Sequence, residues 1–313
     1  MGALRTLGNL LDTGDSQVKR VDEGWELSGS YSDVCGPVEH REVLSDAELL
    51  ARPSVPLSAE ALDDLARQLG RDPLTVPWAR ERRLAEDIAR DDRYAVTRLL
   101  DGVDEPMPTA LGVPLLTLAL DAASWQVALE LLARGAPLVK PPDTAWSPND
   151  FAVASLDDSD GALAVLTMLL DRHLLDPLGG LLRQVWAPRV VRVLVDAGSG
   201  VDATGPSGGA ALDGALEGAT PLSVALIHGC FAVASALVAC GAALDGRDQH
   251  GRSALGLSVY WGKEEPVRWL LERGASLDVA PDSLGRTPRS LAQKYPDHPS
   301  SRALLAAINA VPG

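Results

Sequence analysis

Positively charged residues are in short supply in this 313-residue sequence, which holds 28 Lys and Arg against 43 Asp and Glu. The formal net charge is −15. Proteins that bind DNA or RNA usually present a basic face, because phosphate contacts require Lys or Arg. The composition therefore disfavours nucleic acid and anionic membranes as ligands. It is compatible with a basic protein partner, since opposite charges speed encounter, and equally with a charge that only keeps the chain in solution.

Aromatic residues, cysteines and long apolar runs are also scarce. Phe, Trp and Tyr make up 4% of the residues, so the apolar content is mostly Leu, Ala and Val, which fits small, closely packed helices. Three cysteines are too few, and odd in number, for a disulfide framework. Residues 1–15 lack the features of a secretory signal, and no run approaches the roughly 18 apolar residues that span a bilayer. We therefore expect a cytoplasmic protein, with export by a signal-independent machine left open.

One short pattern recurs along the chain: two apolar residues, two variable residues and a small turn. Its copies begin at Leu99, Leu131, Leu169, Leu194, Leu237, Leu270 and Leu304. These starting points are 32, 38, 25, 43, 33 and 34 positions apart. Four spacings lie close to 33, and the 25 and 43 together make about two periods. The pattern therefore predicts six or seven copies of one structural unit, with a short fourth copy followed by an insertion.

A second pattern keeps the same register, and its copies are GATPLS at 218–223, GRSALG at 251–256 and GRTPRS at 285–290. A Thr such as Thr220 can cap a helix, and the Pro that follows it fits the first helical position. Apolar residues at helical spacing, a glycine, a second helix and a closing glycine follow in each copy. Because neither helix can bury its apolar face alone, neighbouring copies must stack.

At these residues the sequence resembles the ankyrin repeat family, whose pattern is roughly G-x-T-P-L-H-x-A-A-x-x-G, a second helix and L-L-x-x-G-A. The matching segments are 218–244 and 251–277, a C-terminal cap at 285–310, a moderate match at 113–138, divergent copies at 146–176 and 178–198, and an N-terminal cap at 84–102. The resemblance covers about three quarters of the chain. It implies an all-α fold, a right-handed ankyrin-repeat solenoid of helix-turn-helix units at 76–313, behind a small N-terminal module at 1–75.

The sequence departs from the family pattern at one position in every copy. The His of the T-P-L-H turn is absent, and Ser223, Gly256 and Ser290 stand in its place. In the family this His bridges adjacent turns by hydrogen bonds, so we expect looser turns here. Residues 199–217 are rich in Gly, Ala and Ser and have little to bury, which predicts a mobile insertion loop.

Residues 1–75 lack the repeat and resemble no family that we recognise. Leucines at helical spacing in 4–11 suggest a short amphipathic helix. Residues 18–21 and 25–31 flank Asp22-Glu23-Gly24, which predicts a β-hairpin.

A helix is expected at the end of this module. Ser58 suits its N-cap, apolar residues recur from Leu62 to Leu69, and Gly70 ends it. The prolines in 52–56 indicate a linker ahead of it.

No group of residues indicates a reaction or a metal. Cys35 and His40 could share a metal, but zinc sites usually need four ligands at recognisable spacing. Cys230 and Cys240 are expected to be incidental thiols. Adjacent acids are expected to be solvated, at turns or on polar faces, rather than catalytic. These pairs are Asp63-Asp64, Asp91-Asp92 and Asp157-Asp158. Known catalytic and phosphate-binding motifs are missing. We therefore expect no enzyme activity, no cofactor and no metal.

The resemblance implies where a partner binds. In the family, the residues that end the first helix of each repeat face a concave groove, and the β-turn fingers are the other contact surface. The residues here at those places are Tyr260, Trp261, Ile227, His228, Lys294 and Tyr295 at the helix ends, and Gln249, His250 and Arg252 on a finger. Tyr and Trp often anchor interfaces. The alternative is that these rings pack over the helix ends of their own stack.

The function implied by the resemblance is recognition of a partner protein along that groove, by a chain taken by default as a monomer. Three classes stay open. The first is an adaptor for a cellular partner. The second is an immunity or inhibitor protein that blocks a cationic enzyme or toxin. The sequence is rich in Ala, Leu, Asp and Arg, which is typical of GC-rich bacterial genomes and favours this class. The third is an enzyme active in the N-terminal module, which holds one His and one Cys.

Overall fold

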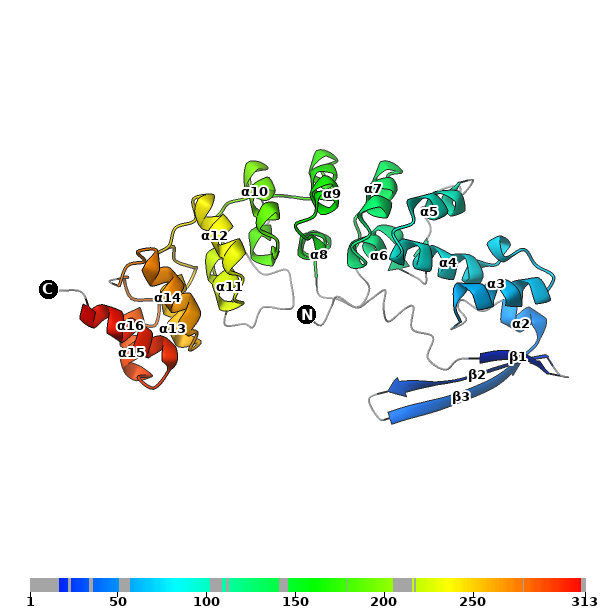
Figure 1. Cartoon of the computed structure of the whole chain (residues 1–313), viewed down its shortest axis with the longest axis horizontal. Coiled ribbons are helices and arrows are strands. Elements are labelled where there is room, and N and C mark those ends of the chain that lie inside the picture. The colour runs from blue at the N-terminus through cyan, green and yellow to red at the C-terminus, as the bar shows by residue number, and fades with distance from the viewer. Residues whose placement is uncertain are drawn as a thin grey trace. The chain divides into compact units, whose positions relative to one another are not determined.

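The computed structural model divides the chain into two compact units, 1–142 and 143–313. In each unit short helices follow one another as pairs joined by tight turns (Figure 1). The residues that the structure describes are 17–21, 24–33, 36–50, 57–101, 109–110, 113–140, 146–178, 180–204, 216, 218–277 and 279–310. Within these ranges no helix is both long and apolar enough to cross a bilayer.

The first unit begins with a three-stranded antiparallel sheet in the order β1-β2-β3. Strands β1 (Gln17–Val21) and β2 (Gly24–Asp33) pair from Gln17 against Ser28 to Val21 against Gly24, which confirms the hairpin. Strand β3 (Gly36–Leu44) pairs with β2 along its whole length. The sequence did not predict β3, because its charged residues mask any apolar alternation. The expected helix at 4–11 and linker at 52–56 lie outside the described residues.

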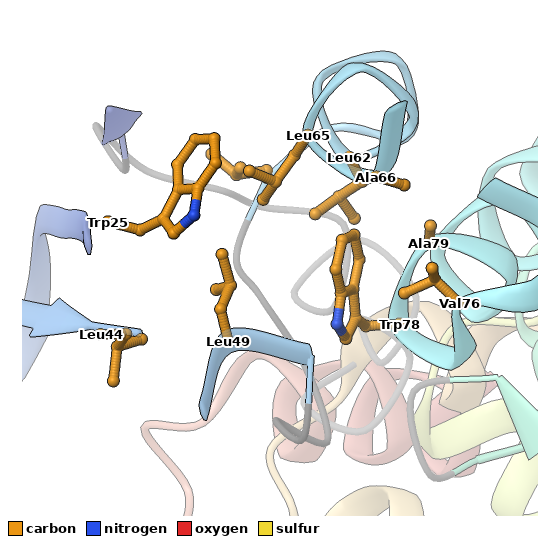
Figure 2. Packing of buried hydrophobic residues seen from close by; sticks show 10 residues of the cluster. Trp25, Leu44, Leu49, Leu62, Leu65, Ala66, Val76, Trp78 and Ala79 are labelled. Carbon is orange, nitrogen blue, oxygen red and sulfur yellow. The ribbon is translucent and has the colours of Figure 1, made fainter. Parts of the chain in front are cut away.

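The sheet is joined to the first helices by a buried apolar cluster (Figure 2). These helices are α2 (Asp46–Leu50), α3 (Ala59–Gln68), the short η1 (Pro73–Thr75) and α4 (Pro77–Ala89). Ser58 caps α3 by accepting from the backbone N–H of Ala61, as predicted. Trp25 from the sheet packs among residues of α2 and α3, and its Nε1 donates to Asp46 Oδ1 at 2.7 Å.

Trp78 of α4 lies in the same cluster, so the N-terminal module packs on the first helix of the repeat region. The division of the chain at residue 75 stays a prediction.

Two helix pairs complete the first unit. The first is α4 with α5 (Arg93–Leu100), so it begins at Pro77 rather than at residue 84. After the two-residue strands β4 (Thr109–Ala110) and β5 (Val113–Pro114) come α6 (Leu115–Asp121) and α7 (Trp125–Ala133). Helix α6 packs beside α4, and α7 beside α5.

The acidic pairs of this unit are not all solvated, and the expectation is wrong for Asp63. That residue is 6% exposed and pairs with Arg83. Asp91 also has a structural role, because its carboxylate accepts from the backbone N–H of Val127 at 2.9 Å, at the start of α7.

The second unit continues the series of helices, and its pairs stand side by side (Figure 1). The elements are α8 (Pro148–Ser155), α9 (Asp160–Asp171), η2 (Leu181–Gln184), α10 (Pro188–Asp196), α11 (Pro221–Ile227), α12 (Phe231–Ala239), α13 (Ala254–Tyr260), α14 (Glu264–Glu272), α15 (Pro288–Lys294) and α16 (Pro299–Ala310). The first helices α11, α13 and α15 pack in a row, and α14 packs against α16.

Local signals explain these helices. Thr220, Ser253 and Thr287 each cap a first helix by accepting from the backbone N–H three residues later. The glycines after the helices have positive φ, from 69° at Gly262 to 107° at Gly198, which only Gly adopts at little cost. Helices α11 to α14 each also bury a leucine, and these are Leu226, Leu237, Leu255 and Leu270. A fully buried side chain of this kind contributes roughly 1.5–3 kcal/mol.

Candidate functional site

The candidate site lies in the second unit and begins with a finger, the turn that precedes α13. Asp248 organises this turn from inside: its side chain is fully buried, and Oδ1 accepts from the backbone N–H groups of His250 at 2.9 Å and Arg252 at 2.7 Å. Its Oδ2 lies 2.5 Å from Arg252 Nε. Gly251 has a φ of +74°, and a Cβ there would come within 2.7 Å of Arg247 Nη2. Asp248, Gly251 and Arg252 therefore shape this turn together.

The turn that precedes α15 is built in the same way. Asp282 Oδ1 accepts from the backbone N–H groups of Leu284 at 2.9 Å and Arg286 at 2.8 Å, and its Oδ2 pairs with Arg286 Nε at 2.8 Å. Burial alone would raise the pKa of Asp282, but the hydrogen bonds from Arg286 and Leu284 outweigh it and lower this pKa below its ordinary value. The sequence repeats D-x-x-G-R at 248–252 and 282–286, which is the local signal for both fingers.

Hydrogen bonds tie the two fingers to each other. The backbone N–H of Ser283 donates to His250 O at 2.8 Å. Arg247 spans the gap, since its Nε donates to Gly251 O at 2.9 Å and its Nη2 to Pro281 O at 2.5 Å. The expectation that loss of the family His loosens the turns is not tested by these contacts, but they show how adjacent fingers are joined without it.

A pocket of about 230 Å³ lies between the two fingers and the first helices α13 and α15. Its apolar lining includes Leu257, Leu284, Pro288 and Leu291. Its polar lining includes Arg252, Arg286 and Asp282. The fingers and the helix layer thus enclose an apolar hollow with two guanidinium groups among its walls.

Tyr260, at the end of α13, forms one side of this pocket. Its side chain is 44% exposed, and the guanidinium carbon of Arg286 lies 5.4 Å from the centre of its ring. Leu284 at the tip of the second finger is 71% exposed. An exposed Tyr and an exposed Leu beside a pocket give a binding partner apolar surface to cover.

Of the predicted contact residues, the structure brings Tyr260 and Arg252 into the pocket lining. Gln249 and His250 lie exposed on the first finger, and the Gln249 amide donates to Thr204 O at 2.5 Å. Residue 204 belongs to the segment predicted as an insertion loop, of which 205–215 and 217 lie outside the described residues.

Trp261 and Ile227 face a second apolar cluster instead. Ile227 is 8% exposed and packs with Leu216, Ala219, Val224 and Leu257, and the half-buried Trp261 packs against this cluster. For these two residues the alternative of packing within the stack describes the contacts found, and they offer a partner less surface than Tyr260 does.

The remaining predicted residues lie at the turns between paired helices. His228 is exposed and meets Trp186 edge to face, with ring centres 5.4 Å apart. Lys294 is exposed, and Tyr295 stacks on His298. None of these residues is among the residues that line the pocket.

Sequence reasoning missed the second finger and Gly256. The repeated D-x-x-G-R spacing could have found Asp282, Leu284 and Arg286 as counterparts of the first finger. The lining by Gly256 depends on α15 from the next repeat, and no local signal reports it.

The repeat geometry agrees with comparisons to known proteins. The sequence model described as "Ankyrin repeats (3 copies)" matches residues 187–281. Over these residues the chain is similar to ankyrin repeats. Among solved structures, the human ASB11 ankyrin repeat domain is similar, with 22% identity, a TM-score of 0.54, and coverage of 74% of this chain and 98% of that one.

The ankyrin repeat domain of Bcl-3, described as a unique member of the IkappaB protein family, is 19% identical with a TM-score of 0.51, covering 73% of this chain and 98% of that one. At this identity the likeness concerns the fold. No curated protein matches the sequence. The ankyrin repeat fold is in general that of a protein-interaction module without enzymatic activity.

The part of the chain that the structure describes contains no group of three or more His, Cys, Asp or Glu placed to hold a metal. Cys230 and Cys240 are free and half-buried, and burial raises the pKa of the Cys230 thiol. A raised pKa leaves less reactive thiolate at neutral pH. Cys35 lies outside the described residues.

Proposed function

We propose that this chain binds a partner protein through the surface formed by the two fingers, the pocket between them and Tyr260. The observation that carries the proposal is the exposed Tyr260 ring at the edge of an apolar pocket, on a framework held by paired Asp and Arg residues. Buried aromatic anchors in pre-organised pockets dominate the affinity of many interfaces. The fingers are tied to each other, so binding is expected to require little rearrangement.

The test uses the tagged full-length chain to recover partners from cells of its source, followed by affinity measurement with the partner recovered. Replacing Tyr260 with Ala is expected to weaken binding at least about tenfold, which corresponds to about 1.4 kcal/mol. The thermal midpoint should stay close to that of the wild type, because the ring is half-exposed. Trp261 is left unchanged, since its packing against the apolar cluster would mix folding with binding.

Tyr94→Ala is the matched control. Tyr94 is also an exposed tyrosine next to an arginine, with the Arg93 guanidinium carbon 4.9 Å from its ring centre, but it belongs to the first unit. Its replacement should leave the affinity unchanged. Equal affinities for the wild type and Tyr260→Ala would rule out this surface, and equal losses for the two tyrosine variants would show that the effect is not local.

A further inference from the structure

The pocket between the fingers owes part of its space to a missing side chain. Gly256 stands on α13 at the position of the family His, and the neighbouring repeats have Ser there. In those repeats the hydroxyl stays at the helix N-terminus: Ser223 Oγ lies 2.9 Å from Thr220 Oγ1, and Ser290 Oγ accepts from the backbone N–H of Thr287 at 2.9 Å. Of these three described helices, α13 is the one with no side chain at the position.

Neither the backbone nor a steric clash requires glycine at this position. Gly256 lies within a helix, and its φ is not among the positive values. A Cβ added there would meet Ser253 Oγ at 3.5 Å and Pro288 Cγ at 3.8 Å, which are ordinary van der Waals distances. Glycine costs helix stability relative to alanine. Gly256 forms part of the pocket lining, so the absence of a side chain there leaves room in the pocket.

The chemistry of the walls indicates what fills that room. Much of the pocket lining is apolar, and these residues are Leu257, Val279, Ala280, Pro288 and Leu291. Ordered water needs several polar partners, and apolar cavities are poor sites for it. An apolar side chain therefore suits this space better than water does.

In the two fingers, the arginine side chains are more exposed than the aspartates with which they pair. The side chains of Asp248 and Asp282 are 0% and 6% exposed, whereas those of Arg252 and Arg286 are 14% and 31% exposed. Each carboxylate also accepts two backbone N–H groups, which take up part of its negative charge. The pocket therefore presents guanidinium groups to a ligand, although the whole chain carries a net charge of −15.

We propose that the pocket binds one apolar side chain of an acidic partner segment, while a neighbouring carboxylate of that segment pairs with Arg252 and Arg286. Arginine forms charge-assisted, often bidentate hydrogen bonds with carboxylates. Gly256 is the residue that sets the size of the side chain accepted. This inference rests on the proposed function, and it replaces a basic partner by an acidic one at this surface.

The experiment selects binders from a displayed library of random linear peptides on the full-length wild-type chain. The selected peptides are expected to share one apolar residue with Asp or Glu close to it. A library that yields no binder, or binders enriched in Lys and Arg, would overturn the proposal.

Two substitutions at Gly256 then test the pocket with a selected peptide. Gly256→Leu places a side chain in the hollow and should weaken binding at least about tenfold. Gly256→Ala adds only the Cβ that fits, and its affinity should stay within about threefold of the wild type. Both variants should melt at or above the wild-type temperature, because Leu and Ala favour helix over Gly. A lower midpoint for Gly256→Ala would contradict the fit of the Cβ on which the design depends.

Comparison with Tyr260→Ala separates the two proposals. One outcome is that Tyr260→Ala weakens binding of the partner recovered from cells, while Gly256→Leu weakens binding of neither that partner nor the peptide. The surface then binds a partner without using the pocket, so the inference fails and the proposed function stands. If neither variant changes binding, both proposals fail. If Gly256→Leu instead abolishes self-association of the chain in sedimentation experiments, a second copy occupies the pocket, and the acidic-segment assignment is overturned.

Discussion

One aspartate side chain fixes the backbone conformation of each finger. In each finger one aspartate holds two backbone N–H groups and one arginine, so the same carboxylate shapes the turn and positions the guanidinium that faces the pocket. Such contacts stabilise the charged form of the acid, and the lowered pKa of Asp282 is their consequence. The finger is therefore expected to weaken when this carboxylate is protonated.

The contribution of Asp282 to stability should depend on pH. Because the folded-state pKa is below the ordinary value of 3.8, the carboxylate contributes stability above that value and loses it as pH falls through the folded pKa. Asp282→Asn keeps an oxygen for the backbone but loses the charge. It should lower the free energy of unfolding by about 1–2 kcal/mol at pH 7, with a smaller difference at pH 3. Urea denaturation at both pH values measures this.

Asp297→Asn is the control, because Asp297 is an exposed acid of the same unit. It should differ little from the wild type at either pH. A difference for Asp282→Asn that grows toward pH 3 would mean that the folded state raises, rather than lowers, the pKa of this carboxyl.

At the scale of elements, two of the described side chains of the N-terminal sheet join it to the helices that follow. Trp25 of β2 and Leu44 of β3 are its members in the buried cluster, where they meet Leu49 of α2 and residues of α3 (Figure 2). Helices α3 and α4, which supply most of the other members, pack on each other, whereas α2 contacts β2 and β3. The sheet should therefore be separable from the helices that follow it.

Removal of the Trp25 side chain is expected to release the sheet and leave the repeats folded. Truncation of a buried aromatic residue typically costs about 3–5 kcal/mol, and Trp25→Ala also removes the hydrogen bond to Asp46. Hydrogen–deuterium exchange read by mass spectrometry should show faster exchange in β1, β2 and β3 and unchanged exchange in α11 to α16.

Val43→Ala, at a half-exposed apolar residue of the same sheet, should leave exchange near the wild-type rate. Faster exchange throughout the repeats of Trp25→Ala would show that the sheet and the helix pairs unfold as one.

At the scale of the whole molecule, the acid excess acts against folding. A net charge of −15 produces self-repulsion in the compact state, and dissolved salt screens it. Many of the ion pairs, such as Arg134 with Glu130 and Arg268 with Glu264, join residues one helical turn apart and are partly exposed, so each contributes little.

The thermal midpoint is therefore expected to rise by a few degrees when sodium chloride is increased from low to roughly 0.5 M, because the Debye length shortens to a few ångströms. Differential scanning calorimetry over a salt series measures this. Melting at lower temperature in high salt would instead mean that attractive ion pairs outweigh the repulsion.

The repeats could be predicted because their signals are local. A Thr or Ser cap, a Pro after it, a Gly with positive φ and leucines at helical spacing each act within one segment, so the order of helices α11 to α16 follows from residues that lie next to one another. The hairpin of β1 and β2 and the helix cap at Ser58 are predictable for the same reason. The role of the contact residues stays a prediction.

What only the tertiary structure decided depends on residues that meet from different repeats. The packing of Trp261 involves Leu216 and Val224 from the preceding repeat. The burial of Asp63 depends on α4, and the space beside Gly256 depends on Pro288. A single repeat specifies which side chains it can offer, whereas the faces that remain open are set by the side chains that the next repeat brings against them.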